Sequence, residues 1–156
     1  LFFNSEVESQ INLTGGERVN VRSQSTECVS CKDYYIHETE YIKFSNEYYE
    51  IFLGIIASTS NNFSIGFLIG EENFSSIFYN NLPLSKENLN GSQLFYDSIS
   101  AYGQVYYHVF SDTLTHRGMI LIDPYPIRVY YSTEFGVIKI DFSDSTSWEL
   151  LKIDWD

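Results

Sequence analysis

The segment IRVYYSTEFGVIKIDFSDSTSWEL, residues 127–150, contains the pattern that decides the fold. Apolar and polar residues alternate along it in three short runs, and a period of two is typical of a half-buried β-strand. The runs are separated at 133–136 and 143–145 by residues such as Gly, Asp and Ser, which favour tight turns. The segment therefore predicts three antiparallel strands joined by two hairpin turns.

The turn at 143–145 sets the register of the last two strands. It places Ile140 opposite Trp148, which are both apolar, and Lys139 opposite Glu149, which carry opposite charges. Because neighbouring residues of a strand point to opposite faces, this register puts the apolar pair on one face and the ionic pair on the other.

The loop that ends at Gly136 sets the register of the preceding pair of strands, and Gly136 supplies the positive φ that such loops require. It places Arg128 opposite Asp141 on the ionic face and Tyr131 opposite Ile138 on the apolar face. Both turns thus predict the same core face, which consists of Ile127, Val129, Tyr131, Ile138, Ile140, Phe142, Trp148 and Leu150.

The rest of the chain has the same β character. Ala57 and Ala101 are its two alanines, whereas Tyr, Phe, Ile, Val and Thr abound, a composition that disfavours helix. Short runs between Gly, Asn, Ser and Asp residues predict strands at 18–23, 34–44, 48–57, 63–69, 76–79, 93–99, 104–110, 118–122, 127–131, 137–142 and 146–153.

Two segments allow other structures. Residues 46–58 form an apolar run that a buried helix would also explain, although its β-branched and aromatic residues favour a strand. Residues 82–91 suit a helical turn or a long loop, with Ser85 as the cap and Gly91 as the stop.

Strands this closely spaced leave no room for crossover helices, so neighbours pair as antiparallel hairpins. We expect residues 1–156 to form a single all-β domain, an antiparallel meander in one curved sheet or half-barrel. A β-sandwich is the alternative arrangement.

The charge limits the partners. Twenty-one acidic residues against nine Lys and Arg give a net charge of −12, which repels phosphate backbones, so we expect no nucleic-acid partner. The longest apolar stretch, 51–57, is far shorter than the roughly 20 residues of a membrane helix. Residue 1 is Leu rather than Met, so a targeting segment, if one existed, has been removed.

Cys28 and Cys31 are the two cysteines. Their spacing allows a small disulfide-closed loop or two ordinary thiols, which we favour, and also redox exchange or half of a zinc site with His37. A β-like segment follows them, whereas a reactive thiolate needs a helix N-terminus or a nearby cation. We expect no cofactor and no metal at this motif.

Three histidines and a high aromatic content supply the remaining candidates. A turn centred on Thr113 would make His108 and His116 diagonal neighbours, close enough to share a metal or a proton. Tyrosine doublets place one ring on each face of a strand, so some rings point away from the core. The predicted ligand-binding residues are Tyr106, His108, His116 and Tyr130, and no catalytic residue is predicted.

A resemblance rests on two strings, GQVYYHVF at 103–110 and IRVYYSTEFGVIKI at 127–140, followed by SWEL at 147–150. They resemble the C-terminal half of uncharacterised secreted or lipid-anchored proteins of Bacteroidetes. The resemblance implies an extracytoplasmic location in the periplasm, at the outer-membrane surface or outside the cell. It also implies a lipid anchor upstream of residue 1 and a sheet or barrel similar to lipocalin-like and lipoprotein-carrier folds. It brings no catalytic residues.

These observations favour a noncatalytic extracytoplasmic module that binds an apolar or glycan ligand, or a protein partner, at the cell envelope. One alternative is a metal-assisted hydrolase that uses His108, His116 and a carboxylate such as Asp112. A structural component of a surface assembly is the other.

Overall fold

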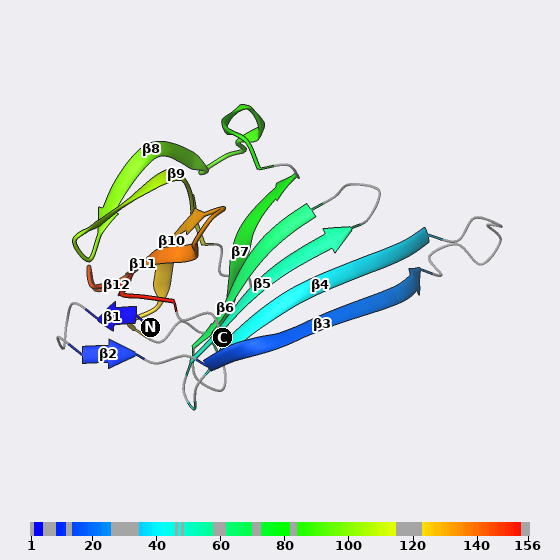
Figure 1. Ribbon diagram of the computed structural model, residues 1–156, viewed down its shortest axis with the longest axis horizontal. Coiled ribbons are helices and arrows are strands. Elements are labelled where there is room, and N and C mark those ends of the chain that lie inside the picture. The colour runs from blue at the N-terminus through cyan, green and yellow to red at the C-terminus, as the bar shows by residue number, and fades with distance from the viewer. Residues whose placement is uncertain are drawn as a thin grey trace.

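The computed structural model describes the backbone of residues 2–4, 9–11, 14–25, 35–45, 47, 49–57, 62–69, 73–81, 84–114 and 123–153. It describes the side chains of residues 45, 47, 84–114 and 123–153. Within these residues the secondary structure is antiparallel β apart from one 3-10 turn, η1 (Lys86–Asn88). The predicted all-β class is confirmed (Figure 1).

The first sheet has seven strands in the order β2-β1-β12-β11-β10-β9-β8. Strands β8 to β12 form a continuous meander, and the N-terminal strand β1 pairs with β12 at its side. The strands are β1 (Phe2–Asn4), β2 (Ser9–Ile11), β8 (Leu94–Ala101), β9 (Gln104–Thr113), β10 (Pro126–Ser132), β11 (Gly136–Phe142) and β12 (Ser147–Leu150).

The second sheet is a five-stranded meander, β3 to β7 in chain order. It contains β5 at the segment for which a helix was the alternative, so the strand prediction is confirmed there. Its strands are β3 (Thr14–Ser25), β4 (Tyr35–Ser45), β5 (Tyr49–Ala57), β6 (Asn62–Ile69) and β7 (Asn73–Asn81). Figure 1 shows β3 and β4 projecting away from the β8–β12 meander.

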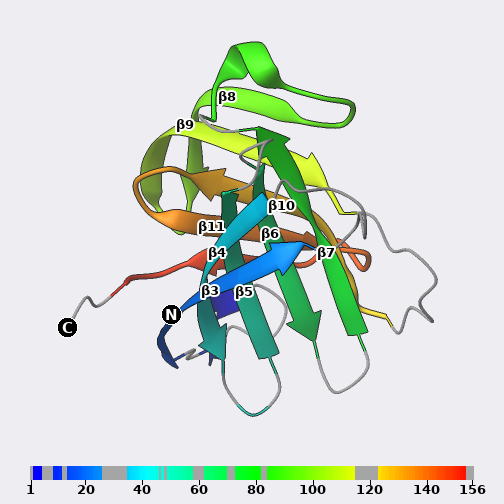
Figure 2. The ribbon, with the colours of Figure 1, turned by 90° about the vertical axis from the view of Figure 1, so that its right-hand side faces the viewer.

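The predicted antiparallel meander is present, but it is divided between two sheets. The connection from β7 to β8 is too long for a hairpin, and its residues Leu84 and Leu89 pack against the core of the β8–β12 meander. The chain therefore changes sheets here, and β7 contacts β9 (Figure 2). Each sheet keeps open edge strands in the described part of the chain, so neither closes into a barrel.

The same connection contains the expected helical turn. η1 begins after Ser85, but the Ser85 hydroxyl makes no capping hydrogen bond, and the backbone leaves helical geometry at Leu89. Gly91 follows with φ +58 and belongs to the next turn rather than to the end of η1. No helix long and apolar enough to span a membrane occurs among the described residues.

The β11–β12 hairpin has the predicted register. Ile140 pairs with Trp148 and Lys139 with Glu149. At the preceding hairpin Arg128 pairs with Asp141, as predicted, and Gly136 has φ +77. The core of the described residues is formed by Ala101, Tyr106, Val109, Phe110, Leu114, Val129, Val137, Ile138, Ile140, Phe142, Trp148 and Leu150.

Two bulges in the β10–β11 ladder correct the rest of the predicted core face. The register shifts between Pro126 and Arg128, so Ile127 is an extra residue, and its side chain is 37% exposed instead of buried. A second shift places Tyr131 opposite Val137 rather than Ile138. A bulge inserts one residue into one strand and interrupts the alternation of faces, which sequence alternation alone does not reveal.

Candidate functional site: a polar band across the β8–β12 meander

One face of the β8–β12 meander carries a band of charged and aromatic side chains that crosses all five strands. Paired residues of neighbouring strands point to the same face, so the ladder registers of β9 to β12 place seven members of the band on one face in two adjacent rows. We call this group, together with Tyr96 on β8, the polar band; it consists of Tyr96, Ser111, Thr113, Arg128, Tyr130, Lys139, Asp141 and Glu149. The opposite face carries core residues such as Val129, Ile140 and Trp148.

Lys139 is the centre of the polar band. Its ammonium lies 3.4 Å from Asp141 Oδ1 and 3.5 Å from Glu149 Oε1. It also lies 5.7 Å from the centre of the Tyr130 ring, within the range of a cation–π contact. These side chains are only half-buried, since Lys139, Asp141 and Glu149 keep about a quarter of their side-chain surface, 25%, 27% and 23%, in solvent.

Tyr130 joins the charged part of the band to its aromatic part. The Tyr130 hydroxyl donates a hydrogen bond of 2.8 Å to Asp141 Oδ2, and its ring lies 6.2 Å from the ring of Tyr96 on β8. Burial, and then the hydrogen bond to the Asp141 carboxylate and its charge, raise the pKa of Tyr130. The hydroxyl is therefore neutral at physiological pH and remains a donor.

Arg128 extends the band toward β9. Its two terminal nitrogens donate to Ser111 Oγ at 3.0 Å and Thr113 Oγ1 at 2.8 Å. Both hydroxyl groups sit on the strand next to β10, because Arg128 pairs with Thr113 in the ladder. The guanidinium thus lies flat along the sheet face, where one edge of the fork is fixed by the two hydroxyls.

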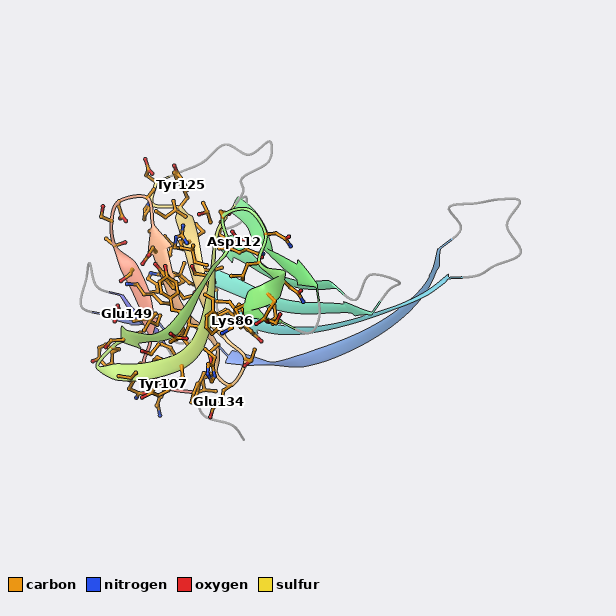
Figure 3. The ribbon with its side chains drawn as sticks, turned by 90° about the horizontal axis from the view of Figure 1, so that it is seen from above. Lys86, Tyr107, Asp112, Tyr125, Glu134 and Glu149 are labelled. Carbon is orange, nitrogen blue, oxygen red and sulfur yellow. The ribbon has the colours of Figure 1, made fainter. Side chains whose placement is uncertain are left out.

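The tip of the β8–β9 hairpin contacts the far end of the band at Glu149. The tip is a two-residue turn in which Tyr102 has φ 43 and Gly103 has φ 75, the geometry of a type I′ turn. The Tyr102 amide donates to Glu149 Oε2 at 2.6 Å. Figure 3 shows Glu149 on the side of the molecule where this hairpin ends, with Tyr107 on the outer side of the hairpin.

The sequence-predicted ligand residues fall in different surroundings. Tyr130 lies in the polar band, whereas Tyr106 is buried, with its hydroxyl 3.2 Å from Gln104 Oε1 and 3.4 Å from the Leu150 carbonyl. His108 is exposed on β9, where its ring stacks on Phe95 at 6.3 Å. His116 lies outside the described residues, as do Cys28 and Cys31 and the strand predicted at 118–122.

The turn that was to bring the two histidines together is not at Thr113. Thr113 is the last residue of β9 and pairs with Arg128, and the chain continues in extended form to the Leu114 amide, which donates to the Ile127 carbonyl. The ladder pairing of β9 with β10 holds this segment straight. Among the side chains that the structure describes, no cluster of three or more His, Cys, Asp and Glu residues is arranged to hold a metal.

Asp112, the carboxylate considered alongside those histidines, has a different set of partners. It is buried, and it accepts hydrogen bonds from Ser92 Oγ at 2.5 Å and Gln93 Nε2 at 3.2 Å. The Gln93 side chain in turn accepts the Asn90 amide at 2.9 Å. Asp112 therefore anchors the connection that precedes β8 to the β8–β12 meander.

Sequence reasoning found part of the polar band and missed the rest. The ionic pairs of Arg128, Lys139, Asp141 and Glu149 followed from alternation and turn positions, but Tyr96 was not singled out. Tyr96 lies on β8, and its neighbourhood to Tyr130 depends on the order of β8, β9 and β10 in the sheet. The regular spacing of these three strands was the signal that would have placed it.

No protein-family model, no curated protein and no solved structure matches the chain.

Proposed function

We propose that the protein is a noncatalytic extracytoplasmic binding module whose polar band holds a neutral glycan. The observation that carries this proposal is the pair of partly buried tyrosine rings, Tyr96 and Tyr130, bordered by Arg128, Lys139 and Asp141 on one sheet face. Sugars present apolar C–H faces that lie on aromatic rings, together with hydroxyls that need donors and acceptors side by side.

The charges of the band support a neutral ligand over an ionic one. Two cations, Arg128 and Lys139, are balanced by two carboxylates, Asp141 and Glu149, so the band itself has no net charge. The chain as a whole carries −12, which repels polyanions. Hydrogen bonds from charged groups to hydroxyls are stronger than those between neutral groups, so the band provides affinity without requiring a charged ligand.

The rigidity of the site favours binding over bond cleavage. Lys139 is within ion-pair distance of both band carboxylates, and Asp141 also accepts the Tyr130 hydroxyl. Both carboxyl groups are thus engaged by side chains of the protein on one sheet face, whereas the two carboxyl groups of a glycosidase flank the glycosidic bond that they cleave. The extracytoplasmic location in this proposal rests on the resemblance to secreted and lipid-anchored chains.

The test is a titration of the purified protein with neutral oligosaccharides, in which calorimetry and NMR measure binding. The sugars are β-1,4-glucans, α-1,4-glucans, mannans, xylans and chitin fragments. Tyr130→Leu is expected to weaken the binding of the sugar that binds by about tenfold or more, since ring and hydroxyl are both lost. Asp141→Asn, which keeps the shape of the side chain, is expected to weaken it less.

Tyr107→Ser is the matched control, because Tyr107 is an exposed tyrosine, 65% accessible, on the outer side of the β8–β9 hairpin. It is expected to bind as the unchanged protein does. Equal affinity of Tyr130→Leu and the unchanged protein, or no binding by any of the five sugar classes, would contradict the proposal.

A further inference from the structure

The connection before β8 contains the one Asn-Gly pair of the sequence, Asn90-Gly91. The pair begins a tight turn, which the Gln93 backbone amide closes by donating to the Asn90 carbonyl at 3.0 Å. Gly91 has φ +58, a left-handed conformation that glycine adopts without strain. Asn90 and Gly91 are both exposed, so the turn presents this pair to water.

No contact separates the Asn90 side chain from the Gly91 backbone. Within the described part of the chain, neither the Asn90 side-chain amide nor the Gly91 backbone amide makes a hydrogen bond. A Cβ placed at Gly91 would have no heavy atom within 4 Å apart from those of its chain neighbours. The approach of the Gly91 nitrogen to the side-chain carbonyl carbon of Asn90 is therefore unobstructed.

These two groups are the reactants of asparagine deamidation. The Gly91 nitrogen attacks Asn90 Cγ, a bond between these atoms forms, and the bond from Cγ to Nδ2 breaks. The side-chain nitrogen leaves as ammonia and takes the proton of the Gly91 amide. Water then opens the resulting succinimide ring at either carbonyl, which gives aspartate or isoaspartate. In isoaspartate the backbone runs through Cγ and is longer by one methylene group.

The turn is attached to the sheet through a buried carboxylate. Ser92 Oγ and Gln93 Nε2 donate to the two oxygens of Asp112, at 2.5 Å and 3.2 Å. Gln93 Oε1 accepts the Asn90 backbone amide at 2.9 Å, so the reacting residue belongs to the same network. An added methylene between Asn90 and Gly91 changes the length of this closed turn, and its hydrogen bonds then lose their geometry.

We propose that Asn90 is a site of spontaneous deamidation and that its isoaspartate product weakens the attachment of residues 84–93 to the β8–β12 meander. This inference goes beyond glycan binding and does not depend on it. Leu84 and Leu89 of the same connection pack against the core of the meander, so a weakened attachment also exposes apolar surface. A slow chemical change in one exposed turn thus loosens the segment that joins the two sheets.

The first experiment follows the reaction in the full chain by mass spectrometry with fragmentation. Asn90 is expected to react at least about tenfold faster than Asn88, which is also exposed but precedes Leu89, whose side chain hinders the attack. The rate should rise about tenfold for each pH unit, because the attacking group is the deprotonated backbone amide, which titrates far above neutral pH. Asn90→Gln, which needs a larger ring for the same reaction, is the matched control and is expected not to react.

The same measurement in urea shows whether the folded turn permits the reaction. The rate at Asn90 in the folded protein is expected to stay within about tenfold of the rate in the unfolded protein, since an exposed turn gives little protection. A larger decrease on folding, or equal rates at Asn90 and Asn88 in the folded protein, would overturn the site.

The second experiment is amide hydrogen exchange on the separated isoaspartate form of the full chain. Exchange in peptides covering 84–93 is expected to rise by about tenfold, as follows from the loss of one or two hydrogen bonds. Asn90→Asp adds the same charge to an unchanged backbone and is expected to raise exchange by a smaller factor. Unchanged exchange in the isoaspartate form, or an equal rise in Asn90→Asp, would overturn the effect of the longer backbone.

Discussion

The β11–β12 hairpin and the β8–β9 hairpin belong to the same sheet, yet they use their side chains differently. In the strands of the first hairpin, at 139–142 and 147–150, burial alternates strictly, with buried residues on one face and half-buried charged or polar residues on the other. The second does not alternate: β9 buries four consecutive residues after His108, from Val109 to Asp112, whereas Tyr106 alone is buried between Gln104 and His108. One residue with a positive φ is enough to turn the following part of a strand.

This difference separates two roles within one sheet. The straight hairpin, β11–β12, is called the floor here. Its register is fixed on both sides, because β11 pairs with β10 and β12 pairs with β1. The bent hairpin forms the cover of the apolar core, because Ala101 and Tyr106 of its outer half belong to that core and it contacts β12 and the β10–β11 turn. The variants below test this division, beginning with the floor.

Trp148→Ala is expected to have the largest effect. Trp148 is 4% exposed, pairs with Ile140 and packs on Phe142 at 5.0 Å, so its removal leaves a large cavity beneath the straight hairpin. We expect a loss of about 3–5 kcal/mol in the free energy of unfolding, measured by urea denaturation. Tyr107→Ala on the outer side of the bent hairpin is the comparison, and there we expect a change within about 0.5 kcal/mol. Similar losses for both variants would abolish the distinction between floor and cover.

His108 tests the bend itself. Because His108 has φ +51, alanine at this position keeps the strain and loses the stacking on Phe95, whereas glycine removes the strain. We expect His108→Gly to be more stable than His108→Ala by about 1 kcal/mol, measured by thermal and urea unfolding. If the alanine variant were the more stable, the left-handed conformation would not be the cause of the bend.

Tyr106→Phe tests the cover through its pH dependence. Burial, and then the charge of Glu149, raise the pKa of the Tyr106 hydroxyl, so the fold favours its neutral form. A raised pKa gives stability that is fully present below the unfolded value, about 10, and is lost as the pH rises through the folded value. The unchanged protein should therefore lose more stability above this pH than Tyr106→Phe does.

Urea denaturation at pH values below and above about 10 measures this difference. In the lower range Tyr106→Phe is expected to be the less stable protein by about 1 kcal/mol, since it lacks the hydroxyl contacts to Gln104 and Leu150. The difference in the free energy of unfolding between the two proteins should become smaller as the pH rises. A difference that stays constant with pH would mean that the hydroxyl is not held in its neutral form.

Lys139→Met is expected to have the smallest effect on stability. Its ion pairs with Asp141 and Glu149 are half-exposed, and pairs of this kind contribute roughly 0.2–1 kcal/mol each at most. We expect a loss of this size at low salt. In about 1 M salt we expect almost no loss, because screening there limits the attraction between charges to a few ångströms. A loss that persists at high salt would show that the lysine stem packs on the floor rather than acting through its charge.

The floor could be predicted from the sequence because alternation and turn chemistry agree there. The Ser, Asp and Gly residues of the two turns fixed the pairing of Ile140 with Trp148 and of Arg128 with Asp141. The prediction failed for the burial of Ile127 and for the partner of Tyr131, although Tyr131 does pack against the core; bulges add a residue to one strand there, and no residue type in the sequence marks the insertion.

The cover and the two-sheet arrangement could not be predicted for a different reason. The bend at His108 and the contact between Tyr102 and Glu149 depend on how distant strands are ordered, and pairing preferences within one hairpin contain no such information. The polar band was accessible only as separate ionic pairs, because Tyr96 joins it through tertiary structure.

The pairing of β1 with β12 has a consequence for how the chain acquires this structure. Phe2 lies opposite Leu150, so nearly the whole sequence, including the complete five-stranded sheet, lies between two adjacent strands. Joining residues this far apart carries a large loop-closure entropy, and contacts of high sequence separation slow folding. Each meander can collapse locally by hairpin formation, whereas the seven-stranded sheet is completed only when the two ends of the sequence meet.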